Sequence, residues 1–463
     1  MQSTKQSPRG IGTAAEAAAF LEANPDVEAV QLVITDACGV GRGKNIAREE
    51  LAALYGSGRN VAGSILGLDV TGEDVNATGL VWDVGDADQS CRPVTGSLCR
   101  APWLARPTAQ VLGTMYELDG RPAVADPRHV LAGAVARCEA AGYTPVVAVE
   151  LEFYLLERDA HGSLQPSSGL LTGERRSRID AYGLGRLDDM APLFDDLYAA
   201  AHAQGLPLRT LMAEYAPGQF EITLEHRADA LRAVDDAILF KRAVRGIAAR
   251  HGRIACFMAK PFAQLAGSGM HLHASLAAAD GQNVFAADDP AGSALLRHAI
   301  GGLRATLGDG MAFYAPNANS YRRFRTMSYA PVAATWGVNN RTVSLRVPAG
   351  PPHSRHVEHR VAGADANPYL VAALVLGGML HGMQTGLDPG PAIEGNGYAQ
   401  PAQDAALPTH WHVALAAAAQ SPFLRDTLGP GFLDVFLAIK RQEAEKFGAL
   451  VTDRDYEWYL DSA

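Results

Sequence analysis

The feature that most constrains the fold of this chain is a set of ionisable side chains two residues apart inside apolar segments. Glu150 and Glu152 interrupt the apolar run VVAVELEFYLLE, and His271 and His273 interrupt GSGMHLHASL. Side chains two residues apart point to the same face of a β-strand. We therefore predict two strands that each present a pair of ionisable groups on one face.

Two further segments add acidic side chains. Glu214 and Glu221 stand on either side of a Pro-Gly pair in LMAEYAPGQFEITL, where a turn would let both flanking strands present an acid. Glu358 and Arg360 share a strand face in HVEHRV. A single pair of this kind is usually a solvated strand face, but several unpaired carboxylates are too costly to bury without compensation. Acids that converge inside a sheet therefore predict bound cations.

The donor types indicate which cation. Carboxylate-rich oxygen sites favour Mg²⁺ or Mn²⁺, and a single imidazole does not exclude them. Zn²⁺ suits the set less well, because neither cysteine nor a set of three histidines accompanies the acids. We predict Mg²⁺ or Mn²⁺.

Arginines cluster in the last third of the chain, namely Arg322, Arg323, Arg325, Arg341, Arg346, Arg355 and Arg360. Guanidinium groups are permanently charged and bind carboxylates and phosphates through two parallel hydrogen bonds. The cluster alone could be a salt-bridged surface. Together with a metal site it indicates a site that neutralises a transferring phosphoryl group.

Composition limits the class of protein. The chain has 463 residues, of which 48% are apolar and 19% charged, as is ordinary for a protein with a large core. The formal net charge of −10 disfavours nucleic acid and anionic lipid as partners. The five scattered cysteines indicate reduced thiols, and we expect a soluble, cytoplasmic protein without a signal peptide or membrane span.

Hydrophobic patterning predicts an α+β protein with a small domain followed by a large one. Residues 1–13 read as a flexible tail, 14–117 as the small domain, 118–463 as the large domain, and 387–408 as a surface loop. Strands of the small domain are expected at 27–36, 61–66, 78–84 and 109–117, with a helix at 14–23 and a Gly-rich turn at 38–44. In the large domain, helices are expected at 127–141, 188–204, 228–250, 291–307, 367–384 and 430–448. Its strands are expected at 145–157, 208–225, 254–260, 269–277, 341–347 and 356–361.

The turn at 38–44 superficially resembles a phosphate-binding loop. Its sequence, CGVGRGKN, has neither the four-residue spacing before Gly-Lys nor the following Ser or Thr of that loop. It does not satisfy the dinucleotide-binding glycine pattern either. We exclude both kinds of nucleotide-binding loop.

Seven segments, in order along most of the chain, resemble the glutamine synthetase family. They are ITDACGVGRGK, VELEF, EYAPGQFEI, KPFAQLAGSGMHLHASL, NANSYRRF, NNRTVSLRVP and RHVEHRVAGADANPYL. The resemblance implies an N-terminal β-grasp domain and a C-terminal catalytic domain with a curved antiparallel sheet flanked by helices. It also implies a homo-oligomer of two stacked hexameric rings with active sites shared between subunits.

The resemblance also implies roles for individual residues. One metal ion would be held by Glu152, Glu214 and Glu221, and a second, bridging the ATP phosphates, by Glu150, His271 and Glu358. Phosphates would be bound by Arg341, Arg346, His273 and Ser275, and the substrate glutamate by Arg323, Arg360 and the backbone at Gly267. Catalytic roles would fall to Asp36, Arg341, Arg346 and Tyr329, with Asp36 reaching from one subunit to the amine in its neighbour's site.

The implied reaction has two steps and uses ATP with two or three Mg²⁺ or Mn²⁺ ions. The γ-carboxylate of L-glutamate takes the terminal phosphoryl group of ATP, and a neutral amine then attacks the γ-glutamyl phosphate. The chain would be an ADP-forming glutamate–amine ligase.

One departure from the family bears on the amine. In Ser328-Tyr329-Ala330-Pro331 a tyrosine stands where glutamine synthetases carry the flap glutamate that helps deprotonate ammonium, and the asparagine before Gly-Ser-Gly-Met-His is Ala266 here. The sequences of the GRGK, NRTVSLRVP and EHRVAGADANPY motifs resemble the γ-glutamylamine synthetase branch, which acts on putrescine, alkylamines and anilines in amine catabolism. An aromatic gate favours packing against an organic amine. Tyr329, together with Trp411 between two histidines, predicts a preference for a hydrophobic or aromatic amine.

Two other functions remain open at this point. The chain could make glutamine from ammonia, which the loss of the flap acid disfavours. It could also be a non-catalytic structural or regulatory relative, but such relatives should lose metal ligands or phosphate-facing arginines, and this chain keeps both sets.

Overall fold

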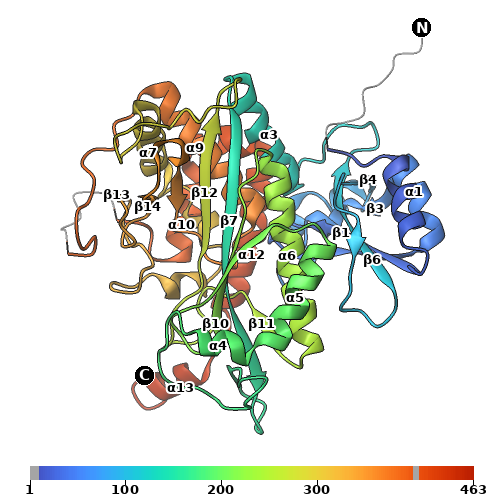
Figure 1. Ribbon diagram of the computed structural model, residues 1–463, viewed down its shortest axis with the longest axis horizontal. Coiled ribbons are helices and arrows are strands. Elements are labelled where there is room, and N and C mark those ends of the chain that lie inside the picture. The colour runs from blue at the N-terminus through green and yellow to red at the C-terminus, as the bar shows by residue number, and fades with distance from the viewer. Residues whose placement is uncertain (1–9, 400–405) are drawn as a thin grey trace.

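The computed structural model describes residues 10–399 and 406–463. The predicted tail at 1–13 and the predicted loop at 387–408 therefore lie partly outside the described residues. At the end of the predicted tail, Ile11 forms a β-bridge with Val94, and Thr13 caps the first helix by accepting from the backbone N–H of Glu16. The described chain folds around two sheets, each accompanied by helices (Figure 1).

The first sheet belongs to the N-terminal part of the chain. Its strands are β1 (Ala29–Thr35), β2 (Gly41–Ala47), β3 (Arg59–Ala62), β4 (Asp88–Pro93), β5 (Cys99–Arg100) and β6 (Thr108–Tyr116), with helices α1 (Ala14–Ala23) and α2 (Leu51–Ser57). The strand order is β2-β1-β6-β4-β3, with β5 also on β6, and only the β1–β6 pair is parallel. The mixed sheet with two helices suits the β-grasp prediction, which stays a prediction.

Part of the predicted Gly-rich turn is in fact a strand. Residues from Gly41 onward pair with the full length of β1, with Gly43 opposite Val33. A Cβ atom at Gly43 would lie 1.8 Å from the carbonyl oxygen of Leu32, so the two strands can approach only because this residue is glycine. The glycines that suggested a turn instead permit strand pairing.

The predicted strand at 78–84 is wrong. That region contains two 3₁₀ turns, Asn76–Thr78 and Trp82–Val84, and each ends at a glycine in the left-handed conformation. Trp82 is 74% exposed, so the apolar residues of this stretch do not form a buried strand face. The predicted strand at 61–66 is also shorter, because β3 ends at Ala62 and a 3₁₀ turn, Gly63–Leu66, follows.

The second sheet contains the segments with paired ionisable side chains. Its strands are β7 (Thr144–Arg158), β8 (Leu164–Pro166), β9 (Leu208–Ala213), β10 (Gln219–Leu224), β11 (Ile254–Cys256), β12 (Met270–Ala277), β13 (Trp336–Val338), β14 (Leu345–Val347) and β15 (Val357–His359). The order is β13-β14-β15-β12-β7-β10-β9, and β8 and β11 also pair with β7. The pairing is antiparallel as predicted, except that β13 runs parallel to β14.

Helices flank this sheet. They are α3 (Pro127–Ala140), α4 (Leu184–Asp189), α5 (Ala191–Ala203), α6 (Ala230–Arg250), α7 (Ala294–Thr306), α8 (Met311–Tyr314), α9 (Pro368–Thr385), α10 (Trp411–Gln420), α11 (Pro422–Leu428), α12 (Pro430–Gly448) and α13 (Asp453–Tyr459). Each of the six predicted helical regions contains a helix, whereas α4, which overlaps only the start of the region predicted at 188–204, and α8, α10, α11 and α13 were not predicted. The mixture of helices and sheets confirms the predicted α+β class.

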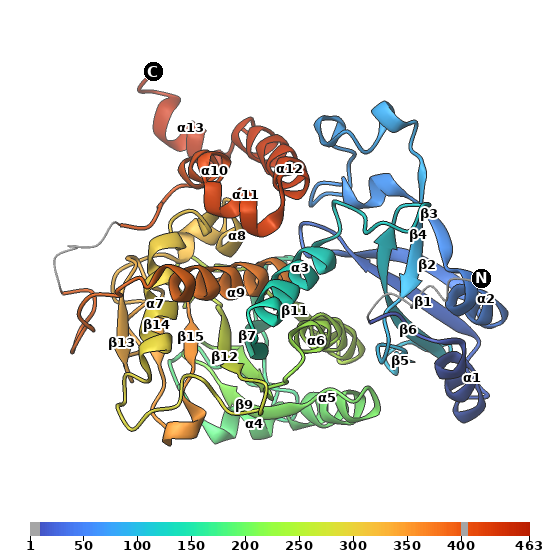
Figure 2. The same cartoon turned by 90° about the horizontal axis from the view of Figure 1, so that it is seen from above.

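The helix α6 joins the two halves of the molecule. It lies between the second sheet and the N-terminal strands (Figure 2). One face packs on β7, and Arg242 on another face donates to the side-chain oxygens of Gln110 and Gln31 at 2.9 and 2.8 Å. The helix is therefore buried on two sides, which explains its long run of buried residues.

Within the described ranges, none of the helices has both the length and the apolar character needed to cross a membrane. All five cysteines fall within these ranges and carry free thiols.

Candidate active site

The register of the second sheet places the predicted acids and histidines next to one another. Glu150 on β7 is paired with His271 on β12, and Glu152 is paired with Glu221 on β10. On the other side of β12, His273 is paired with Glu358 on β15. Neighbouring strands lie about 4.8 Å apart, so paired side chains on one face are in contact distance.

All six predicted metal ligands converge on this face of the sheet. One ligand atom from each of Glu152, Glu214 and Glu221 lies within 4.8 Å of the others, and the same holds for Glu150, Glu221 and His271. His271 Nδ1 lies 3.1 Å from Glu150 Oε2 and 3.6 Å from Glu358 Oε1. The structure thus brings together the residues of both predicted metal sets.

The acids on the β10 side of this cluster lack compensating charge. Burial, reinforced by the charge of Glu152, raises the pKa of Glu214 to about 7. Burial and the charges of Glu150 and Glu152 raise the pKa of Glu221 well above its ordinary value. Crowded, buried carboxylates of this kind are stabilised by a divalent cation, and a donor set of carboxylates with one imidazole fits Mg²⁺ or Mn²⁺.

The acids on the β15 side are compensated by cations of the protein. Although burial opposes the shift, the neighbouring Arg360 lowers the pKa of Glu358 to about 2. Glu358 accepts a hydrogen bond from Arg346 at 2.7 Å and forms an ion pair with Arg360. Likewise His273 and His271 hold the pKa of Glu150 well below its ordinary range, against the effect of burial. The cluster therefore has an uncompensated, acidic end at β10 and an end at β15 where arginines and histidines balance the carboxylates.

A cavity of about 250 Å³ opens beside the β10 end. Its lining includes the acids Glu152 and Glu214, the arginines Arg323 and Arg360, and Gly267, all predicted site residues. Arg323 is buried, and its guanidinium donates to the carbonyl oxygens of Val361 and Arg360 at 2.8 and 3.3 Å. These bonds fix its position, so that a rigid positive charge faces the acids across the cavity.

The segment around Tyr329 forms another wall of the same cavity. Met327, Ser328, Tyr329 and Ala330 line it, and both Met327 and Tyr329 have left-handed backbone conformations with φ of 59° and 57°. Such conformations are unfavourable for side-chain-bearing residues and persist where the surrounding structure holds them. Here the hydroxyl of Tyr398 donates to the carbonyl oxygen of Ala330 at 2.9 Å. The structure therefore holds the predicted flap residue at the predicted site.

Comparison with known proteins identifies the family. The family model described as "Glutamine synthetase, catalytic domain" matches residues 124–459. This chain belongs to the glutamine synthetase family.

Several relatives within the family act on organic amines by name. The chain is 40% identical over 459 residues to γ-glutamylputrescine synthetase of Escherichia coli K12, covering 98% of this chain and 96% of that one. It is 32% identical to glutamate–isopropylamine ligase of a Pseudomonas species (96% of both chains) and 32% identical to γ-glutamylethanolamide synthetase of Streptomyces coelicolor (94% and 92%).

A solved structure of the same family has the same fold. The structure titled "GmaS/ADP complex-Conformation 1" matches with a TM-score of 0.83 at 28% identity, covering 96% of this chain and 99% of that one. The family resemblance read from the seven sequence segments is confirmed.

Three of the four predicted phosphate-binding residues, His273, Ser275 and Arg346, lie toward the β15 end. Ser275 follows His273 on the same face of β12 and is buried. Arg346 on β14 is held by Glu358 and by Asn339, whose side-chain oxygen accepts at 3.0 Å. Arg341 is exposed, and its positive charge acts to lower the pKa of Glu214, against the larger effect of burial. These positions leave the phosphate role of the four residues a prediction.

Asp36 does not join this site within the subunit. Its side chain is fully buried, and its carboxylate accepts hydrogen bonds from the backbone N–H of Val40 and from Arg42, both at 2.9 Å. These bonds hold the turn between β1 and β2. A role for Asp36 toward the amine in a neighbouring subunit stays a prediction.

Trp411 also lies outside the candidate site. It is buried at the start of α10 and lines a different cavity with Phe447 and Leu450. Of the two residues that suggested an aromatic amine, only Tyr329 faces the acids.

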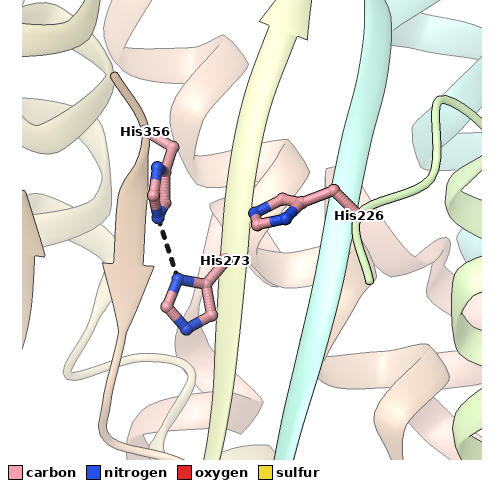
Figure 3. Close-up of side chains that lie close together, drawn as sticks. All are labelled: His226, His273 and His356. Carbon is pink, nitrogen blue, oxygen red and sulfur yellow. Dashed lines mark hydrogen bonds between the residues drawn. The ribbon is translucent and has the colours of Figure 1, made fainter. Parts of the chain in front are cut away.

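Three residues in or beside the site were not predicted. Gln219 donates from Nε2 to the carbonyl oxygen of Gly267 at 2.9 Å and lies against Glu152. His226 and His356 lie beside His273 (Figure 3). His356 precedes Glu358 by two residues, so the period-two pattern could have found it, whereas His226 lies beyond the end of β10 and carries no sequence signal.

Proposed function

We propose that this chain is an ATP-dependent ligase that joins the γ-carboxylate of L-glutamate to an organic amine through γ-glutamyl phosphate, in amine catabolism. The observation that carries the proposal is the cavity in which Glu152 and Glu214 face Arg323 and Arg360, with Tyr329 as a wall. One cavity thus combines groups for divalent cations, for a carboxylate substrate and for an apolar amine. The named activities of the three relatives support the same reaction class.

The acid cluster would hold the cations that ATP requires. One Mg²⁺ or Mn²⁺ ion would be held by Glu152, Glu214 and Glu221, and another by Glu150, His271 and Glu358. When bound, these ions neutralise phosphate oxygens and make the terminal phosphoryl group more electrophilic. The first of these ions would offset the negative charge that the β10 end leaves uncompensated, and a third ion could bind the phosphates.

The protein's own cations would bind and orient the two anionic substrates. Arg323 and Arg360, with the backbone at Gly267, would hold glutamate so that its γ-carboxylate points at the terminal phosphate. Arg341, Arg346, His273 and Ser275 would hold the phosphates and spread the charge that develops during transfer. Fixed donors of this kind stabilise a transition state because they need no reorganisation as the charge moves.

The amine would enter beside Tyr329. This wall presents Met327, Tyr329 and Leu265, which offer apolar surface to a carbon skeleton but no carboxylate to attract ammonium. We therefore propose an amine with an apolar carbon skeleton rather than ammonia. Asp36 would reach the amine from a neighbouring subunit, with its carboxylate oriented by Arg42.

The double hexameric ring stays part of the proposal. Exposed apolar residues such as Leu171 and Leu184, at 65% and 72% exposure, offer surface that assembly could cover. Light scattering of the purified protein tests this directly, with twelve subunits expected.

The experiment that tests the ligase is phosphate release from ATP with Mg²⁺ and glutamate, across ammonia, isopropylamine, ethanolamine, putrescine and aniline. We expect turnover with at least one organic amine that clearly exceeds turnover with ammonia, and a γ-glutamylamide identified by mass spectrometry. Turnover with ammonia alone would overturn the proposed amine class. No turnover with any amine would overturn the ligase and favour a non-catalytic relative.

A further inference from the structure

Three histidines from separate segments meet at the β15 end of the site. His273 lies on β12, His356 directly precedes β15, and His226 follows β10 (Figure 3). One ring nitrogen from each lies within 4.8 Å of the other two. The ring centroids are 5.1 Å apart for His273 and His356, 5.4 Å for His226 and His356, and 6.0 Å for His226 and His273.

The rings of His273 and His356 each turn one nitrogen toward the other ring. The second nitrogen of each ring lies beside a different group. His356 Nδ1 lies 2.7 Å from the carbonyl oxygen of Ser354, which can only accept, so this nitrogen donates. His273 Nε2 lies 3.0 Å from Glu150 Oε1, without a hydrogen bond of good geometry, and the negative charge of the carboxylate favours a proton on this nitrogen. In the neutral rings, the bare nitrogens are therefore His356 Nε2 and His273 Nδ1, which lie 2.9 Å apart.

Two bare imidazole nitrogens at this distance repel one another unless a positive species lies between or beside them. That species is either a proton or a metal ion. Metal-ligating histidines characteristically donate their other ring nitrogen to a backbone carbonyl or a carboxylate. Here His356 donates to the carbonyl oxygen of Ser354, and the carboxylate of Glu150 lies beside His273 Nε2. The third ring, His226, is exposed and leaves the solvent side open for a further ligand such as water.

We propose that His226, His273 and His356 form a binding site for a divalent transition-metal ion such as Zn²⁺, separate from the carboxylate site for Mg²⁺ or Mn²⁺. Three imidazoles bind Zn²⁺ and its neighbours in the first-row series far better than they bind Mg²⁺, which prefers oxygen. The two sites are adjacent because Glu150 lies against both His271 and His273.

The site has a consequence that rests on the proposed function. That function assigns His273 to the ATP phosphates, so a transition metal on His273 Nδ1 would hold this side chain and alter nucleotide binding. The metal site itself rests only on the three rings and their partners.

The test is titration of the purified full-length protein with Co²⁺ in excess Mg²⁺, without ATP, glutamate or amine. Mg²⁺ occupies the oxygen-rich cluster, and the visible absorption of Co²⁺ reports imidazole ligands at low coordination number. We expect one Co²⁺ ion per subunit with this visible absorption, and we expect Zn²⁺ to displace it. In His226→Gln and in His356→Gln the affinity should fall at least about ten-fold.

The matched control is His161→Gln, in an exposed turn between β7 and β8, which should bind Co²⁺ like the unchanged protein. Because His226 is exposed, its replacement leaves the core intact, and circular dichroism verifies this for each variant. Absence of the Co²⁺ bands, or equal affinity in all variants, would overturn the proposal and leave a proton between His273 and His356. Since no substrate is present, this result is independent of whether the ligase reaction occurs.

Discussion

Two buried charged clusters in this molecule differ in how their charges are compensated. In the first, between α3 and α6, Arg128 donates from Nε and Nη2 to the two oxygens of Asp235, both at 2.9 Å. The hydroxyl of Tyr369 on α9 donates to the same carboxylate at 2.6 Å. The side chains of Arg128 and Asp235 are 8% and 1% exposed, so one positive and one negative charge are buried together.

The second cluster is the acid cluster of the large sheet. Across the described ranges, neither Glu214 nor Glu221 forms an ion pair with an arginine or lysine, although Glu221 is only 4% exposed. Burial without a partner is unfavourable for a carboxylate. Buried charges that are matched within the protein therefore support the fold, whereas buried like charges are stabilised only when a cation binds them. Asp36, matched by Arg42, belongs to the first kind.

The largest expected effect is on turnover, and it arises only in the acid cluster of the large sheet. Glu221→Gln should lower turnover by about 1,000-fold or more, because it removes a ligand of the proposed cation site. The same change should leave the stability of the metal-free protein equal or higher, since it removes a repelling charge. Turnover is measured as ADP formation and stability by urea unfolding. Glu225→Gln, at an exposed acid just beyond β10, is the control and should do neither. Near-normal turnover of Glu221→Gln would break the distinction.

The second prediction concerns the matched cluster. Arg128→Leu should lower the free energy of unfolding by about 3–5 kcal/mol, because it leaves Asp235 buried without its partner. Urea unfolding measures the change, and turnover per folded molecule should stay near normal. Replacing both residues, Arg128→Leu with Asp235→Leu, should recover much of the loss, since an apolar pair removes the unpaired charge. A loss of turnover at full stability would instead place Arg128 in the catalytic machinery.

The sequence predicted the second sheet and its acids well because their signals are local. The long β7 and β12 carry both apolar character and period-two ionisable pairs, and α12 has the bounds of its predicted helix. Predictions failed at glycines, because glycine occurs both where strands approach closely and where a turn needs a left-handed backbone. The glycines of β2 allow close strand pairing, whereas those that end the 3₁₀ turns near residues 78 and 84 stop a strand from forming.

The sequence predicted those site residues that share one face of a strand through period-two spacing. Pairing register cannot be read from one segment alone, so no sequence pattern indicates that His226 lies beside His273 or that Gln219 donates to Gly267. The role predicted for Asp36 in a neighbouring subunit stays a prediction, and family resemblance does not report how the carboxylate is held within its own subunit. Its partner Arg42 lies on the adjacent strand, six residues away, and only the pairing of β1 with β2 shows that the carboxylate is occupied.

The third prediction uses the pKa values of the acid cluster. Burial raises the pKa of Glu214 from 4.5 to about 7, so between these values the folded metal-free protein binds more protons than the unfolded chain. The stability of the metal-free protein should therefore fall as the pH rises through this window.

Added Mg²⁺ should reverse this trend, because it binds the ionised acids of the folded state. At about 100 times its Kd, Mg²⁺ should stabilise by about 2.7 kcal/mol near about pH 8 and by clearly less near about pH 5. Differential scanning calorimetry with and without chelator measures both arms. In Glu221→Gln the Mg²⁺ effect should shrink at high pH. A Mg²⁺ effect that is equal at both pH values would show that the acids are compensated in another way.

The smallest expected effect concerns selectivity for the amine. Tyr329 is 60% exposed, so Tyr329→Ala should change stability by no more than about 0.5 kcal/mol. Removal of the aromatic wall should lower kcat/KM for the preferred organic amine by about ten-fold, the size expected for loss of apolar contact in a binding pocket. The KM for ATP and for glutamate should stay unchanged, because Tyr329 touches the cavity only on the amine side of the proposal. Tyr456→Ala, at an exposed tyrosine on α13, is the matched control.

If Tyr329→Ala slows all amines equally, the tyrosine positions the backbone of its segment and does not select the amine. Robust turnover of putrescine, with none of isopropylamine or aniline, would contradict the predicted preference for a hydrophobic or aromatic amine and show that the acids of the cavity, and not its apolar wall, choose the substrate.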